Sequence, residues 1–187
     1  PDTTLVIAEA GVNHNGDPLL ARRMIDVARE AGADIVKFQA FNAEQEISRY
    51  APKASYQKEN TGADGNQLDL CKALELSGEA LKSLMQYCAK IRMPFLCTAF
   101  DFESVDLLCD ELKVSAIKIG SAEVTDLPLL EYIGSKKIGA ILSTGASTLA
   151  EVGTAIETLN RSGCTELVLL HCVSSYHAPI GQVNLRA

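Results

Sequence analysis

The chain has 187 residues, of which 47% are hydrophobic and 22% charged, a balance typical of a globular domain with a substantial core. The formal net charge is −7 and there is no long basic run, which argues against nucleic acid and anionic membranes as partners. The six cysteines form no Cys-x-x-Cys motif. With no signal peptide or long apolar stretch either, we expect a cytoplasmic protein with reduced thiols.

Six short apolar runs predict β-strands, and the amphipathic segments between them predict helices. The expected strands cover residues 5–9, 34–39, 94–98, 116–119, 140–143 and 167–171. The side chains expected to begin the helices are Asp17, Ser77, Asp101, Asp126 and Thr148, the last forming a capping box with Glu151. Alternating strands and helices predict an α/β protein with a parallel sheet. No Gly-x-Gly-x-x-Gly follows the first strand, so a dinucleotide fold lacks its fingerprint.

Residues 41–66 interrupt this alternation, because they show no clear periodicity and are too long for an ordinary connection. A lid or substrate loop is one interpretation of this segment, and a passive insertion is the other.

The expected strands share one feature: each carries a polar residue at or near its C-terminal end. These residues are Glu9, Lys37 with Gln39, Thr98, Lys118, Ser143 and His171. A (β/α)8 barrel places its active site at this end of its strands. Such a barrel needs eight strands and about 250 residues. We therefore predict that residues 1–187 form the first six βα units of a (β/α)8 (TIM) barrel, with the last two strands beyond Ala187.

Two of the polar residues are lysines on otherwise apolar strands. Lys37 shares a strand face with Ile35 and Gln39, and Lys118 shares one with Ala116. An ammonium group on a buried strand is costly unless something anionic meets it. The pair predicts a pocket for an anion. The alternative is two structural lysines, held in ion pairs or reaching the rim.

These residues belong to motifs that resemble those of the sialic acid synthases (N-acetylneuraminate synthases). The motifs run through the whole chain in the family's order: Ile7-Ala-Glu-Ala-Gly-Val-Asn-His-Asn-Gly16, Val36-Lys-Phe-Gln39, Ala51-Pro-Lys-Ala-Ser-Tyr-Gln57, Lys118-Ile-Gly-Ser121, Leu142-Ser-Thr-Gly145 and Leu170-His-Cys172 with Tyr176. The resemblance covers the N-terminal barrel portion of a family member, and the family's small C-terminal antifreeze-like domain is absent from residues 1–187.

The resemblance implies an activity and its reactants. The family condenses phosphoenolpyruvate with an N-acetylated aldose to give a nonulosonic (sialic) acid and phosphate. N-acetylmannosamine is the expected sugar. The resemblance also implies a divalent metal ion, Mn²⁺ in first place with Mg²⁺ or Co²⁺ as alternatives, no organic cofactor, and a homodimer of the full-length protein.

The resemblance also assigns roles to matching residues. Those implied to bind phosphoenolpyruvate are Lys37, Thr98, Lys118, Ser121 and Ser143. Those implied to bind the sugar are Glu9, Gln39, Glu123, Ser174 and Tyr176. Among them, Glu9, Lys37 and Lys118 are the expected catalytic groups. The family's metal-binding histidines are expected beyond Ala187, so none of His14, His171 and His177 is taken as a metal ligand, and His14 is expected to organise the first loop.

Three alternatives stay open. A related phosphoenolpyruvate-dependent synthase would make legionaminic or pseudaminic acid. A Schiff-base aldolase would use Lys37 or Lys118 as its nucleophile, and borohydride trapping with substrate would reveal it. A non-catalytic barrel fragment would serve as a binding module. We also expect residues 1–187 to be inactive alone, because a six-stranded piece of a barrel leaves two strand edges unpaired.

Overall fold

The computed structural model describes residues 4–52, 66–175, 178–184 and 186. The chain divides into two compact units, 1–97 and 98–187, and the division falls within strand β3. Half of the interrupting segment expected to be a lid or an insertion, residues 53–65, lies outside the described residues, as do Tyr176 and His177.

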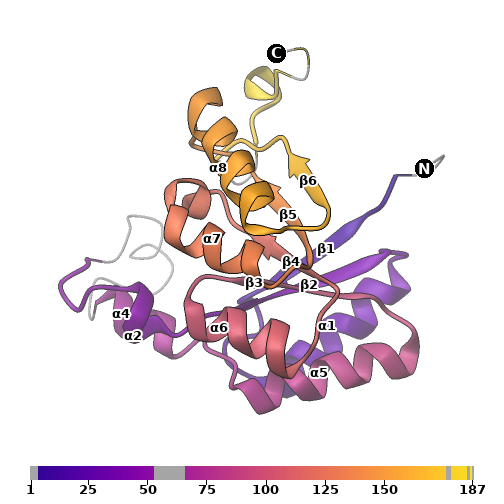
Figure 1. Cartoon of the computed structure of the whole chain (residues 1–187). Helices are drawn as coiled ribbons and strands as arrows, with labels where there is room; N and C mark the ends of the chain where they lie inside the picture. The colour runs from indigo at the N-terminus through magenta and orange to yellow at the C-terminus, as the bar shows by residue number, and fades with distance from the viewer. Residues whose placement is uncertain (1–3, 53–65, 176–177, 185, 187) are drawn as a thin grey trace. The chain divides into compact units, whose positions relative to one another are not determined.

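The first unit alternates strands and helices, and short helices flank the segment that is not described (Figure 1). Its elements are β1 (Ile7–Gly11), α1 (Pro18–Glu30), β2 (Ile35–Ala40), α2 (Ala43–Glu46), α4 (Gln67–Lys72), α5 (Gly78–Ile91) and the start of β3 (Phe95–Ala99). β1 and β2 are parallel, with Glu9 opposite Lys37 in the register. Val36 N–H donates to the Pro94 carbonyl, which joins β2 to the chain entering β3.

The second unit continues the same alternation (Figure 1). Its elements are the end of β3, α6 (Phe102–Asp106) with the π-helical turn η1 (Leu107–Glu111), β4 (Ala116–Ile119), the 3-10 turn η2 (Ala122–Thr125), α7 (Leu127–Ser135), β5 (Gly139–Ser143), α8 (Leu149–Ser162), β6 (Leu167–Leu170) and the 3-10 turn η3 (Ile180–Gln182). β4 is parallel to β3 and β5, and β5 is parallel to β6, so neighbouring strands follow chain order.

The expected strands are confirmed, each to within two residues at its ends. The expected helix starts are confirmed as well, because each predicted side chain accepts a hydrogen bond from a backbone N–H in its own first turn. Thr148 and Glu151 form the full capping box, with Glu151 N–H donating to Thr148 Oγ1 and Thr148 N–H donating to Glu151 Oε2. Local sequence signals therefore set most of the element boundaries.

Each unit buries its apolar side chains between helices and strands. In the first unit α1 packs against α5, where Tyr87 Oη donates to Asp26 Oδ1 at 2.5 Å and Arg22 lies 3.9 Å from the Tyr87 ring centre. Phe38 stacks on Phe95 with ring centres 5.8 Å apart. In the second unit α7 packs along α8 (Figure 1).

The cysteines are free, and only two of them, Cys88 and Cys97, are buried. Burial raises the pKa of both thiols, that of Cys88 to about 12, so both stay protonated at neutral pH and neither is a nucleophile there. No helix in the described ranges combines the length and the apolar character that crossing a membrane requires.

The close packing of α7 on α8 depends on the absence of a side chain at Gly134. A Cβ atom there would lie 2.6 Å from Ser162 Cβ and 2.9 Å from the Leu159 carbonyl oxygen. We expect Gly134→Ala to lower the free energy of unfolding by about 1–3 kcal/mol, the usual cost of overpacking. Chemical denaturation monitored by circular dichroism measures this free energy.

The matched control is Gly153→Ala in α8, where the added Cβ would meet no atom within 4 Å. This variant should be more stable by a few tenths to about 1 kcal/mol, because alanine is the better helix former. Equal effects of the two substitutions would contradict the packing argument.

Candidate functional site

Two clusters of polar side chains, one in each unit, contain most of the residues singled out by the sequence. The first-unit cluster is Glu9, Lys37 and Gln39. The second-unit cluster is Thr98, Lys118, Ser121, Glu123, Ser143 and Ser174. Strand alternation, which places every second side chain on the same face, sets the strand residues of both clusters. Ser121, Glu123 and Ser174 lie in the segments that follow strands.

The first-unit cluster depends on the register of β1 and β2. Glu9 and Lys37 are register partners, and the Lys37 ammonium forms an ion pair with Glu9 Oε2. The register shifts after Glu9, and Gly11 has a φ of +53°, a conformation that glycine adopts without steric cost. A Cβ at Gly11 would lie 3.1 Å from Glu9 Oε1 and 3.8 Å from Gln39 Nε2. The structure therefore brings these three residues together.

This ion pair bears on the two interpretations of Lys37. The carboxylate of Glu9 already meets the ammonium, so the structural ion-pair alternative describes what the structure shows at Lys37. Glu9 keeps 43% of its side chain exposed, whereas Lys37 keeps 12%. An exposed carboxylate can turn away at little cost, which would let an incoming anion approach the Lys37 ammonium. The anion-pocket interpretation of Lys37 stays a prediction.

The second-unit cluster is centred on Lys118, which is only 5% exposed. Its Nζ donates to Ser143 Oγ at 2.6 Å and to the Ile119 carbonyl at 2.5 Å. Thr98 is its register partner on β3 and is also buried. Because register partners on parallel strands point to the same face, the Thr98 hydroxyl, the Lys118 ammonium and the Ser143 hydroxyl share one face of β3, β4 and β5.

The turn after β4 adds two more of the expected residues. Glu123 lies in η2, and its Oε2 atom is buried with no hydrogen-bond partner among the described residues. Burial raises the pKa of the Glu123 carboxyl, and the nearby Lys118 charge acts in the opposite direction. A Cβ at Gly120 would collide with Glu123 Oε2, so the carboxyl lies over bare backbone. Burial therefore favours the protonated form of this carboxyl more than in an exposed one.

The remaining second-unit residues are two serines near the end of β5. Ser121 Oγ accepts a hydrogen bond from Gly145 N–H at 3.0 Å. Ser174 approaches the same glycine from the segment after β6. Tyr176, the other expected sugar contact from that segment, lies outside the described residues.

Two histidines can be placed. His14 is buried and its Nδ1 accepts a hydrogen bond from Gly16 N–H at 3.1 Å, which confirms that it organises the first loop. Burial lowers the pKa of His14, so the neutral ring is favoured. His171 was expected to complete the row of polar strand ends. It instead lies just past the end of β6, exposed, with Nε2 2.6 Å from the Val183 carbonyl oxygen.

The described residues hold no group of three or more histidine, cysteine, aspartate or glutamate side chains arranged to bind a metal ion. The described part of the chain does not fit the metal that the resemblance implies, and no chemical step is assigned to a metal here. The expectation that metal ligands lie beyond Ala187 stays a prediction.

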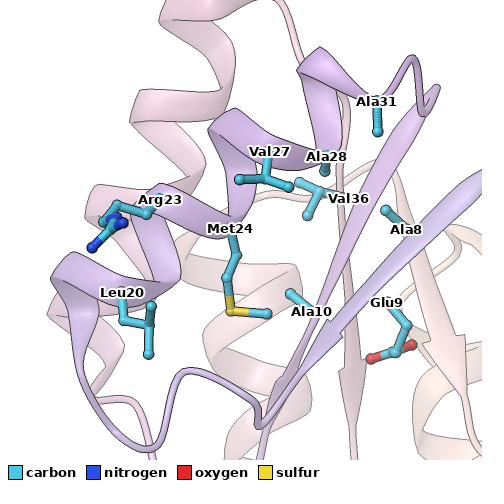
Figure 2. Close-up of a pocket in the computed structure, with 10 residues that line it drawn as sticks. All are labelled: Ala8, Glu9, Ala10, Leu20, Arg23, Met24, Val27, Ala28, Ala31 and Val36. Carbon is cyan, nitrogen blue, oxygen red and sulfur yellow. The ribbon is translucent and has the colours of Figure 1, made fainter.

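A cavity that sequence reasoning missed lies between α1 and the face of β1 that carries Ala8 and Ala10 (Figure 2). Its volume is about 440 Å³, and its lining is mostly apolar, with Leu20, Met24 and Val27 on the α1 side. Figure 2 shows the Glu9 carboxylate directed away from α1, as alternation along β1 requires. The Glu9 carboxylate therefore points away from α1, although Glu9 and the positively charged Arg23 both belong to the otherwise apolar lining.

The comparisons with known proteins agree with this fold. The chain matches the NeuB family model over residues 24–187. It is 47% identical to N,N'-diacetyllegionaminic acid synthase from Campylobacter jejuni, over 98% of this chain and 55% of that one. It is 44% identical to the synthase of the same name from Legionella pneumophila, over 99% of this chain and 53% of that one. The chain thus spans about half the length of these curated relatives.

A solved structure has a similar fold. The crystal structure of N-acetylneuraminic acid (sialic acid) synthetase from Leptospira borgpetersenii, in complex with citrate, matches with a TM-score of 0.81 and 34% identity. The match covers 96% of this chain and 57% of that one. It confirms the expected fold class, six parallel βα units of an incomplete (β/α)8 barrel. The family match and the solved structure together show that the chain belongs to the NeuB family, the sialic acid synthase family that its motifs resemble.

Proposed function

We propose that the protein containing this chain condenses phosphoenolpyruvate with an N-acetylated aldose, giving a nonulosonic acid and phosphate. The observation that carries the proposal is the buried Lys118 ammonium, which shares one strand face with the hydroxyls of Thr98 and Ser143. An ammonium surrounded by hydroxyl groups in a poorly hydrated site suits an anion such as a carboxylate or phosphate. Family membership supports the same reaction class.

The proposed chemistry uses the chain's own residues to bind and to move protons. The enol carbon of phosphoenolpyruvate bonds to the aldehyde carbon of the open-chain sugar, and the aldehyde oxygen takes a proton. Water adds at the neighbouring carbon, and phosphate leaves from the tetrahedral intermediate. In this proposal phosphoenolpyruvate is bound and oriented by Lys37, Thr98, Lys118, Ser121 and Ser143.

The sugar side of the proposal involves the carboxylates. Glu9 is suited to proton transfer at the aldehyde oxygen or a hydroxyl, because its carboxylate is partly exposed beside Lys37. Gln39, Glu123 and Ser174 contact the sugar. The divalent metal, Mn²⁺ in first place, and the homodimer of the full-length protein are part of the proposal, with the metal ligands outside the described residues.

The identity of the sugar has two candidates. N-acetylmannosamine is the sugar expected from the sequence motifs. The two relatives at 47% and 44% identity are named for a product with two N-acetyl groups, which favours a sugar that carries two acetamido groups. Both candidates use the same phosphoenolpyruvate chemistry and differ only at the sugar contacts.

The lysine prediction tests the reaction class. We expect Lys118→Met to weaken phosphoenolpyruvate binding by about 2 kcal/mol, roughly 30-fold, because a buried charge-assisted contact is lost. We expect Lys37→Met to weaken it in the same direction. Titration calorimetry on the protein expressed from its natural reading frame measures this affinity, with circular dichroism checking that each variant is folded.

The matched control is Lys82→Met, an exposed lysine on α5, which should bind phosphoenolpyruvate as the unsubstituted protein does. Unchanged binding in both Lys118→Met and Lys37→Met would rule out the proposed phosphate and carboxylate contacts.

The sugar prediction distinguishes the two candidates. The protein is incubated with phosphoenolpyruvate, Mn²⁺ and either N-acetylmannosamine or a 2,4-diacetamido sugar, and phosphate release is followed together with the nonulosonic acid. We expect kcat/KM to be at least tenfold higher for the diacetamido sugar, because a site that holds a second amide discriminates against a sugar lacking it. A higher kcat/KM with N-acetylmannosamine would instead identify N-acetylmannosamine as the sugar substrate. If neither sugar led to release of phosphate, the proposed function would be contradicted.

A further inference from the structure

Gly145 lies just after β5 and contacts two of the expected site residues, although no role was expected for it. Its backbone N–H donates to Ser121 Oγ at 3.0 Å. The neighbouring residues hold it in place: Thr144 N–H and Thr144 Oγ1 both donate to the Leu170 carbonyl, and Ser147 Oγ donates to the Gly145 carbonyl. The N–H that reaches Ser121 is therefore fixed by its own loop.

The missing side chain of Gly145 leaves a space that two serine hydroxyls share. A Cβ atom there would lie 2.7 Å from Ser174 Oγ and 3.0 Å from Ser121 Oγ, so both hydroxyls lie within 3.0 Å of one point. Gly145 is not among the glycines with positive φ, so its backbone conformation would accept alanine. The neighbouring serines, rather than backbone strain, are what require glycine at this position.

The hydrogen bond from Gly145 also determines what Ser121 can do. A serine hydroxyl has one proton to donate and two acceptor lone pairs. Since Ser121 Oγ accepts from Gly145 N–H, its own proton is left for another acceptor, and the hydroxyl donates to no group within the described residues. A hydroxyl oriented in this way suits an acceptor oxygen, such as that of a carboxylate or phosphate.

We propose that Gly145 is a positioning residue, which orients the Ser121 hydroxyl toward an anionic oxygen of phosphoenolpyruvate and keeps open the space beside Ser174. The proposal rests on the proposed function. It places a phosphoenolpyruvate contact and a sugar contact at one point, and it makes the backbone of the β5 loop part of the binding arrangement.

The test compares phosphoenolpyruvate affinity among four variants of the protein expressed from its natural reading frame, measured by titration calorimetry. Gly145→Ala should bind at least tenfold more weakly, and Ser121→Ala should lose a similar factor. In the Ser121→Ala background, Gly145→Ala should add less than threefold, because the hydroxyl that it positions is already gone. In steady-state assays the KM for phosphoenolpyruvate should rise more than kcat falls.

The control is Gly153→Ala, where the added methyl group meets no atom within 4 Å, and its affinity should stay within twofold of the unsubstituted protein. Affinity in Gly145→Ala equal to that of the unsubstituted protein would overturn the inference while leaving the proposed function standing. Additive losses in the double variant would overturn it too, since Gly145 would then not act through Ser121. If Gly145→Ala does not fold, the test relies on Ser121→Ala, which adds no volume. Unchanged binding of phosphoenolpyruvate in Ser121→Ala would overturn the inference.

Absence of phosphoenolpyruvate binding in the folded, unsubstituted protein would overturn the proposed function and this inference together. The two failures are thus distinguishable by the behaviour of the unsubstituted protein alone.

Discussion

The buried ammonium group of Lys118 sets the strongest constraint on the second unit. It lies on β4 between Ile117 and Ile119, both fully buried. Moving an ammonium group out of water costs several kcal/mol, so the charge can stay there only with well-placed oxygen partners. Ser143 Oγ and the Ile119 carbonyl supply them. Because Ser143 belongs to β5, this contact also fixes which face of β5 lies on the same side of the sheet as Lys118.

A second constraint comes from glycines that lie at or just beyond strand ends. Gly11 leaves room beside Glu9 and Gln39, Gly120 lies under the Glu123 carboxyl, and Gly145 lies between two serine hydroxyls. Each of these glycines allows polar atoms to approach the backbone closely, where a methyl group would displace them. The polar clusters are therefore built from side chains held against bare backbone as much as from side chains held against each other.

Local signals explain how much of the fold the sequence could predict. The strands, the caps at Asp17 and Ser77 and the Thr148–Glu151 capping box depend on residues close in sequence, and all are confirmed. The short helices α2 and α4 were not predicted, because they are too short to show periodicity. Long-range contacts hold the two short helices together: the Glu75 carboxylate, just after α4, accepts from Ala43 N–H in α2, and Lys72 of α4 forms an ion pair with Glu44 of α2.

The positions of the candidate site residues were predictable where they depend on the alternation of side chains along a strand. Parity along β4 and β5 correctly placed Lys118 and Ser143 on one face. The same alternation gave a wrong prediction for His171, because β6 ends at Leu170, one residue before it. The His171 side chain contacts the Val183 carbonyl instead. The contact of Gly145 with Ser121 joins loops after two different strands, so no spacing in the sequence could reveal it. The Glu9–Lys37 ion pair likewise needs the register of β1 and β2, which pattern reading does not supply.

The central claim is that the Lys118 ammonium holds an anionic group of the substrate. Its most direct test is heteronuclear NMR of lysine ammonium groups, with the Lys118 signal assigned by its loss in Lys118→Met, during titration with phosphoenolpyruvate. The account predicts that the Lys118 signal shifts with a saturable dependence that matches the calorimetric affinity. An unchanged Lys118 signal while phosphoenolpyruvate binds would place the anion elsewhere and contradict the account.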